Sequence, residues 1–218
     1  MEMTTRMIRV NRKLVLVASL TAVVVGLGTG IAFAAAENDT DGITPASTNF
    51  TSSSTNVTFS GTINGLPINV KCTSDSLTGK TPASGSGLGP FTINNPTFSS
   101  CGSGLSVTTN STNGSWQLTF VDAPNDEGAT EGTGQMGDQI KITIPKAGAK
   151  FTDAFIPGCT ITAAPTGAAS ITGAYDDVNT LTLSSASVPV SASGCTAAST
   201  TTVSGTYSSG TTHIQDSS

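Results

Sequence analysis

The fold is decided by the stretch Val57-Thr-Phe-Ser-Gly-Thr-Ile-Asn-Gly-Leu-Pro-Ile-Asn-Val-Lys-Cys-Thr73. Apolar and polar residues alternate on both sides of Asn64-Gly65. A period of two residues is typical of a half-buried strand, and Asn-Gly between two such runs is the strongest short signal for a β-hairpin. The stretch therefore predicts two antiparallel strands joined by a tight turn.

The same alternation recurs along the rest of the chain. A second hairpin is expected between Leu105–Val107 and Trp116–Phe120, and Ile140, Ile142 and Ile144 alternate cleanly. Turn-forming residues interrupt the chain every 8–12 residues or so, and no helical stretch follows the N-terminal segment. This pattern is typical of an antiparallel sandwich or barrel, and we expect an immunoglobulin-like or jelly-roll-like sandwich of about ten strands. Further strands are expected around 91–93, 150–155, 159–162, 170–174, 180–183, 188–192 and 201–207.

Two segments are predicted to be long loops, Leu77–Gly89 and Ala123–Gln139. Loops of more than about 12 residues in a compact domain are often functional or mobile. Within the second hairpin, Trp116 has the same parity as Leu118 and Phe120. We therefore expect Trp116 to be a core residue and not a platform for a sugar ring.

Residues 1–36 resemble a bacterial export signal of the Sec type. A basic segment is followed by the apolar run Leu14–Phe33 and by small residues, which suit cleavage between Ala34 and Glu37. The alternative is an uncleaved anchor, because a run of about 20 apolar residues can span a bilayer. We expect a secreted or cell-envelope protein with a flexible linker at 37–42, one domain at 43–207 and a flexible tail at 208–218.

The four cysteines all lie after the signal. In an oxidising compartment an even number of cysteines predicts disulfides, and four allow three pairings. We favour Cys72–Cys101 and Cys159–Cys195, since each bridge closes a short segment within one half of the chain. Zinc is disfavoured because zinc motifs usually contain closely spaced ligand pairs.

The charge pattern excludes nucleic acid as a partner. The chain has a net charge of −5, and charged residues make up only 11% of it. Binding to phosphates needs clustered basic residues, and an anionic membrane surface needs the same. After the signal the basic residues are the lysines at 71, 80, 141, 146 and 150.

Catalytic signals are weak. His213 is the sole histidine and lies in the expected tail, where it cannot be held against a serine or cysteine nucleophile. Carboxylates at turns are more often solvated turn residues than glycosidase pairs. We therefore expect no enzyme and no cofactor.

A calcium ion is the one ligand that the acids suggest. Asp122, Asp126 and Glu127 lie close together beside Gly128, and calcium prefers carboxylate and carbonyl oxygens in flexible loops. The spacing lacks the regular calcium-loop pattern, so a solvated acidic loop is the alternative. These three residues form the candidate metal site.

Four short segments carry a resemblance to a group of small exported bacterial β-proteins. They are Ile43-Thr-Pro-Ala-Ser-Thr-Asn-Phe-Thr51, Asn69-Val-Lys-Cys-Thr73, Pro96-Thr-Phe-Ser-Ser-Cys101 and Ser193-Gly-Cys195. The chain resembles hypothetical secreted proteins of actinobacteria and, more distantly, the family of alkane oxidation protein activators. The resemblance implies an exported β-protein and carries over no functional residues.

We expect a non-enzymatic cell-surface or secreted protein that acts by binding or structural contacts with envelope components. One alternative is a carrier or activator for apolar small molecules, which the alkane resemblance and the Gly-rich loops suggest. Another is a surface fibre subunit, because low charge and Thr-rich strands suit edge-to-edge pairing.

Overall fold

The computed structural model describes residues 42–83, 89–102, 104–121, 139–176, 179–209 and 215–217, and every regular element in them is a β-strand. These residues belong to the unit Asn38–Ser218. All pairings between the strands are antiparallel. The predicted all-β antiparallel class is therefore confirmed. In the described part of the chain, no helix has the length and apolar character needed to cross a membrane.

Eight of the strands close into a ring, which makes this part of the fold a barrel and corrects the expected ten-stranded sandwich. Each strand pairs with the next, and the last pairs back with the first. Around the ring the strands are β15 (Thr200–Ser208), β2 (Asn49–Ser54), β5 (Ser74–Lys80), β6 (Phe91–Ile93), β9 (Trp116–Val121), β10 (Gln139–Ile144), β13 (Ala169–Asp176) and β14 (Thr180–Ser193).

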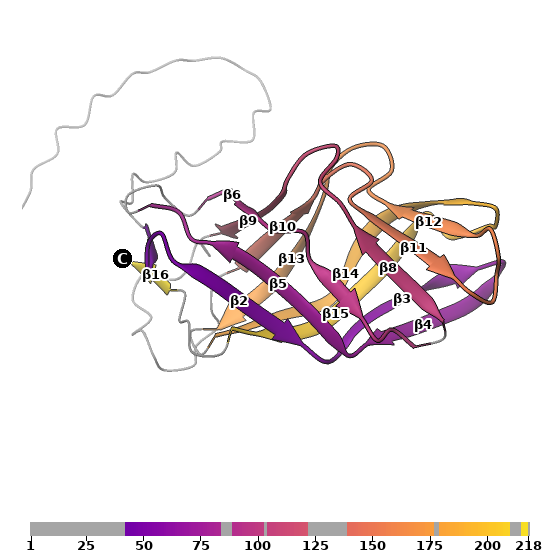
Figure 1. Ribbon diagram of the computed structural model, residues 1–218, viewed down its shortest axis with the longest axis horizontal. Coiled ribbons are helices and arrows are strands. Elements are labelled where there is room, and N and C mark those ends of the chain that lie inside the picture. Colours follow the sequence, from indigo (N-terminus) through magenta and orange to yellow (C-terminus); the bar gives the residue numbers. More distant parts are fainter. Residues whose placement is uncertain are drawn as a thin grey trace, which may run out of the picture. The chain divides into compact units, whose positions relative to one another are not determined.

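Further strands extend from β14 and β15 beyond the ring (Figure 1). From β14 the order continues through β12 (Thr160–Ala163) and β11 (Ala149–Asp153) to β8 (Leu105–Thr109). From β15 it continues through β3 (Val57–Ile63) to β4 (Leu66–Cys72), while β7 (Thr97–Ser99) pairs with β5. Because β14 and β15 also pair with each other, they belong both to the ring and to this attached sheet.

The β-structure extends past both expected ends of the domain. The strand β1 (Gly42–Thr44) pairs with β16 (Gln215–Ser217) as a separate two-stranded sheet. Residues 215–217 were expected in a flexible tail, whereas their backbone forms this pair. Residues 1–41, which include the expected signal, lie outside the described residues.

Because of a bulge, β14 directs apolar side chains into the core both in the ring and in the attached sheet. The pairing with β15 shifts by one residue between Leu183 and Ala186. Before the shift the buried residues are Leu181 and Leu183, and after it they are Val188 and Val190. One extra residue reverses which parity faces inward, and a bulge also bends the strand. The sequence had predicted two separate strands here.

The hairpin at Asn64-Gly65 has the predicted turn. Ile63 pairs with Leu66, so the loop holds two residues. Both have a positive φ, 52° at Asn64 and 78° at Gly65. A two-residue loop with two positive φ angles is a type I′ turn, whose twist matches that of the flanking strands.

The two expected loops have different outcomes. The first four residues of Leu77–Gly89 belong to β5, so that prediction is wrong in its first part. Leu77 alternates with the buried Asp75, which is why the strand continues through it. Of the second expected loop, residues 123–138 lie outside the described residues, and Gln139 begins β10.

One core joins the ring and the attached sheet. The buried apolar residues form a single cluster, and the predicted core position of Trp116 is confirmed by an exposure of 4%. Disulfides join Cys72 to Cys101 and Cys159 to Cys195, the pairings that the spacing favoured. Each closes a loop for which the chain-entropy account gives about 3–4 kcal/mol of stabilisation.

Replacement of two glycines tests the turn. Gly65 and Gly167 both have open space around the position of an added Cβ, but only Gly65 has a positive φ. We expect Gly65→Ala to lower the free energy of unfolding by 1–2 kcal/mol or so, since alanine is disfavoured in this conformation. We expect Gly167→Ala to be neutral or slightly stabilising. Urea titration of both variants measures the difference, and equal effects would contradict the type I′ turn.

Candidate functional site

The predicted calcium ligands Asp122, Asp126 and Glu127 lie outside the described residues. The calcium site therefore stays a prediction. Within the described ranges, no group of three or more His, Cys, Asp or Glu side chains is placed to hold a metal ion. The features that stand out in the described residues are instead apolar cavities.

An inner cavity of about 50 Å³ lies in the core. Residues of the ring and of the attached sheet both line it, including Phe59, Trp116, Ile142, Phe151 and Tyr207. Protein interiors are otherwise close-packed, and an empty apolar cavity of this size lowers stability by about 1 kcal/mol. The protein thus tolerates a void that larger side chains would fill.

Small side chains occupy neighbouring positions in one part of the cavity wall. Ala149 on β11 and Ala163 on β12 are directly opposite each other, and both line the inner cavity. Their neighbours in the wall are Val188 on β14 and Val203 on β15. Alanine and valine side chains are short, so the space in front of these residues stays unfilled.

A smaller outer pocket of about 20 Å³ adjoins the inner cavity. The two share Phe59, Phe151 and Thr201 in their linings. The outer pocket is also lined by Thr62 and Ala198, which are exposed to solvent. The outer pocket therefore leads from the surface to the residues that bound the inner cavity.

Aromatic rings stand between the two spaces. The ring of Phe59 packs edge to face against Phe151, with centroids 5.1 Å apart. It packs in the same manner against Phe98 at 5.3 Å. Edge-to-face pairs stabilise by about 0.5–1.5 kcal/mol beyond the area they bury, and a ring rotation that breaks one costs energy of this order.

Trp116 is fixed in the wall of the inner cavity. Its indole Nε1 donates a hydrogen bond to the carbonyl oxygen of Asn110 at 3.1 Å. The rest of the ring is buried, and no other tryptophan occurs in the chain. Trp116 is therefore both the core residue that the sequence predicted and an optical reporter of whatever occupies the cavity.

Asp75 is a buried carboxyl group on β5. Its side chain is 3% exposed, and neither carboxyl oxygen has a hydrogen-bond partner in proper geometry among the described residues. Burial raises the pKa of Asp75 from 3.8 to about 6, although the nearby backbone N–H groups of Ser99 and Val57 offset part of this effect. Asp75 thus gains a proton more readily than an ordinary aspartate.

Tyr207 lines the inner cavity and is influenced by the charge of Asp75. The Tyr207 side chain is buried and lines the cavity. Burial raises the pKa of its hydroxyl, and the negative charge of Asp75 raises it further. The polar part of the wall is therefore a neutral phenol with a titratable carboxyl group near it.

Sequence reasoning missed Asp75 and the cavity. The signal for Asp75 was its parity, because it alternates with Leu77 and so faces inward. The cavity has no comparable local signal, since many strands distant in sequence contribute to its wall. Comparisons of the chain with protein-family models, curated proteins and solved structures found no match.

The titration of Asp75 gives a pH-dependent stability. The pKa of about 6 in the folded protein exceeds the ordinary 3.8, so between these values the folded state binds more protons than the unfolded state. Stability therefore falls as the pH rises from 4 to 6, and the loss is complete above that range. We expect Asp75→Asn to stabilise the protein by about 1–3 kcal/mol at pH 8 and by little at pH 4.

The measurement is the free energy of unfolding of the wild-type protein and of Asp75→Asn at each pH. The difference between the two curves removes the contribution of the other acids. A difference that stays constant from pH 4 to pH 8 would mean that Asp75 does not titrate in this range.

Proposed function

We propose that the protein is a non-enzymatic, exported binding protein and that its ligand is a small apolar molecule held in the inner cavity. The observation that carries the proposal is the cavity itself, a space of about 50 Å³ with an almost wholly apolar wall. A polar cavity of this size fills with water, but an apolar one stays dry and accepts apolar molecules. The energetic cost of keeping the void is then offset when the ligand binds.

The size of the cavity restricts the ligand. A cavity of about 150 Å³ binds benzene, so a space of about 50 Å³ admits either a ring or a six-carbon chain only if the wall moves outward. The adjoining outer pocket adds about 20 Å³ next to Phe59, Phe151 and Thr201. Slender molecules fit this arrangement better than bulky ones, and n-alkyl chains are suitable probes.

The export part of the proposal rests on the signal-like segment 1–36 and is supported by the two disulfides. Disulfides persist in oxidising compartments outside the cytosol. The non-enzymatic part rests on the sequence, in which the sole histidine is His213. Calcium bound by Asp122, Asp126 and Glu127 remains a further proposal that concerns a different part of the chain.

Contact with envelope components is a second candidate function. Leu66 and Phe155 are the large apolar side chains with high exposure in the described residues, at 68% and 77%. Exposed apolar side chains favour protein or surface contacts when they form a patch. These two come from different parts of the chain, so this candidate has less support than the cavity.

A fibre formed by strand addition has less support still. The carbonyl of Lys71 on β4 accepts a hydrogen bond from the N–H of Gly102 at 2.9 Å, so its backbone groups face away from β3. By the alternation of an antiparallel ladder, Asn69 and Pro67 face the same outer edge. Proline has no N–H, and a lysine side chain discourages pairing at an edge. The β4 edge is therefore a poor template for another strand.

Quenching of Trp116 tests the proposed function. Bromine is a heavy atom that quenches tryptophan at contact, so we expect 1-bromohexane to quench Trp116 saturably. Unbrominated n-alkanes are expected to compete, with about fourfold tighter binding for each added methylene until the space is filled. Quenching that never saturates, or that n-hexane does not relieve, would overturn the proposal.

A pair of matched variants shows whether the ligand occupies the inner cavity. Val188 lines it, whereas the equally buried Val70 lines neither pocket. We expect Val188→Ile to stabilise the protein by up to about 0.8 kcal/mol and to weaken 1-bromohexane about fourfold or more, because its added methyl group takes ligand space. Val70→Ile adds its methyl group away from both pockets in a buried position, so it is expected to cost about 1–3 kcal/mol and to leave the affinity unchanged. Equal affinities in both variants would place the ligand elsewhere.

A further inference from the structure

The outer pocket lies between two segments that are far apart in the sequence. One is the β3–β4 hairpin, which contributes Thr62 and Ile68, and the other is the connection from β14 to β15, which contributes Ala197 and Ala198. At its inner end are Phe59 and Phe151, which also line the inner cavity. The outer pocket thus has an exposed end and an end that reaches the proposed ligand site.

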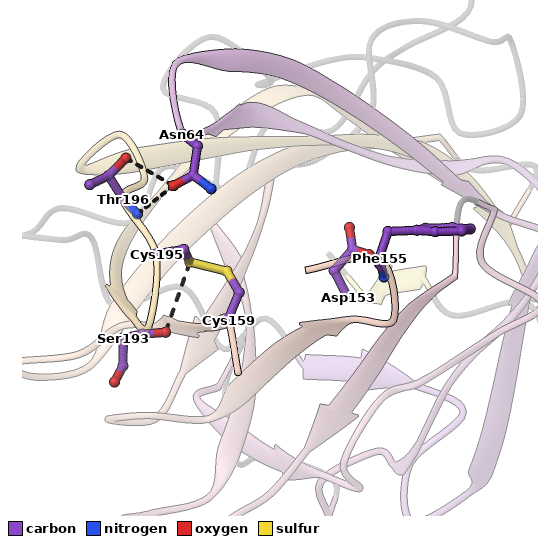
Figure 2. The surroundings of a disulfide bond; sticks show 7 residues. All are labelled: Asn64, Asp153, Phe155, Cys159, Ser193, Cys195 and Thr196. Atoms are coloured by element: carbon purple, nitrogen blue, oxygen red, sulfur yellow. Dashed lines mark hydrogen bonds between the residues drawn. A yellow bond between two sulfur atoms is a disulfide. The ribbon is translucent and has the colours of Figure 1, made fainter. Parts of the chain in front are cut away.

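A tie of hydrogen bonds joins the two segments (Figure 2). The Oδ1 atom of Asn64 accepts hydrogen bonds from the N–H of Thr196 at 3.0 Å and from its hydroxyl at 3.2 Å. The N–H of Asn64 donates to the carbonyl of Thr196 at 2.8 Å. We call these three bonds the Asn64–Thr196 tie.

The tie acts on a connection that is fixed on its other side. Cys195 precedes Thr196 and is bonded to Cys159, which is buried (Figure 2). One residue after Thr196, Ala197 forms a β-bridge with Ile63. The disulfide therefore holds the connection against the core, while the tie and the bridge hold the hairpin against the connection.

The contacts between the hairpin tip and the connection differ from the strand pairing around the ring. Around the ring each strand pairs with two neighbours, through ladders at most joints and through a single residue pair at two, Ser208 with Ser53 and Gly79 with Ile93. The tie joins residues that are exposed to solvent. Exposed hydrogen bonds at loop tips are among the first to open in native proteins. Separation of the hairpin tip from the connection therefore breaks few bonds, and it does so at the exposed end of the outer pocket.

We propose that the inner cavity and the outer pocket form one elongated site for an unbranched alkyl chain, that the chain passes between them at Phe59 and Phe151, and that the Asn64–Thr196 tie limits the rate of access. This inference rests on the proposed function and adds the shape of the ligand and its route. A linear chain passes a narrow junction that excludes a ring of similar carbon number, so n-hexane is bound in preference to cyclohexane.

Stopped-flow quenching of Trp116 by 1-bromohexane tests the route. Asn64→Gly removes the Oδ1 acceptor but keeps a residue that tolerates the positive φ at this position. We expect association and dissociation to accelerate by a common factor of about ten, because loss of two hydrogen bonds makes opening easier by a similar factor. The dissociation constant is expected to stay unchanged, since Asn64 touches neither pocket.

Two further variants serve as controls. Asn64→Asp keeps an oxygen acceptor and is expected to restore rates close to those of the wild type. Thr196→Val removes only the hydroxyl bond and is expected to accelerate both rates by a smaller factor than Asn64→Gly, about threefold. A merely structural role of Asn64 would change stability and not both rates equally.

The outcomes separate the two proposals. Saturable quenching with wild-type rates in Asn64→Gly would overturn the route and leave the proposed function standing. Equal binding of cyclohexane and n-hexane would overturn the elongated site. Absence of saturable quenching in the wild-type protein would overturn the proposed function itself, and the route with it.

Discussion

The pairing of β14 with β15 is the interaction on which the rest of the described structure depends. The two strands are hydrogen-bonded on both sides of one bulge, from Thr180–Ser208 to Pro189–Thr200. On one side of the bulge the pair closes the ring of eight strands, and on the other it carries the attached sheet. The extra residue in β14 keeps apolar side chains facing inward in both halves, which lets one core serve both.

The cavity arises where these two halves share their core. Residues of the ring, such as Trp116 and Ile142, face residues of the attached sheet, such as Phe151 and Ala163. The side chains that meet here leave space unfilled. The charge of the buried Asp75 carboxyl group acts on Tyr207, which lines the same cavity. Both features lower stability, and proteins retain such features most often at sites of function. The two disulfides offset part of this cost.

Local patterns predicted individual strands better than their partners: the expected hairpin between Leu105–Val107 and Trp116–Phe120 is wrong, because β8 pairs with β11 whereas β9 pairs with β6 and β10. Alternation identified the hairpin at Asn64-Gly65, the inward face of Trp116 and the strand Ile140–Ile144, because each depends only on neighbours in sequence. Ring closure was not predictable in this way, since it depends on how β14 bends at a bulge that the sequence marks only with two serines. The strand β2 was also missed, because Ser52 and Ser54 occupy buried positions where apolar residues are expected.

The candidate site was less predictable than the fold. The acids Asp122, Asp126 and Glu127 attracted attention because they are adjacent in sequence, whereas the cavity is assembled from residues that only tertiary structure brings together. The central claim is that this cavity is dry and accepts apolar guests. A crystal structure under xenon pressure tests it most directly. We predict a xenon atom between Trp116 and Phe151 and no ordered water there, and water molecules in that space with no xenon would contradict the claim.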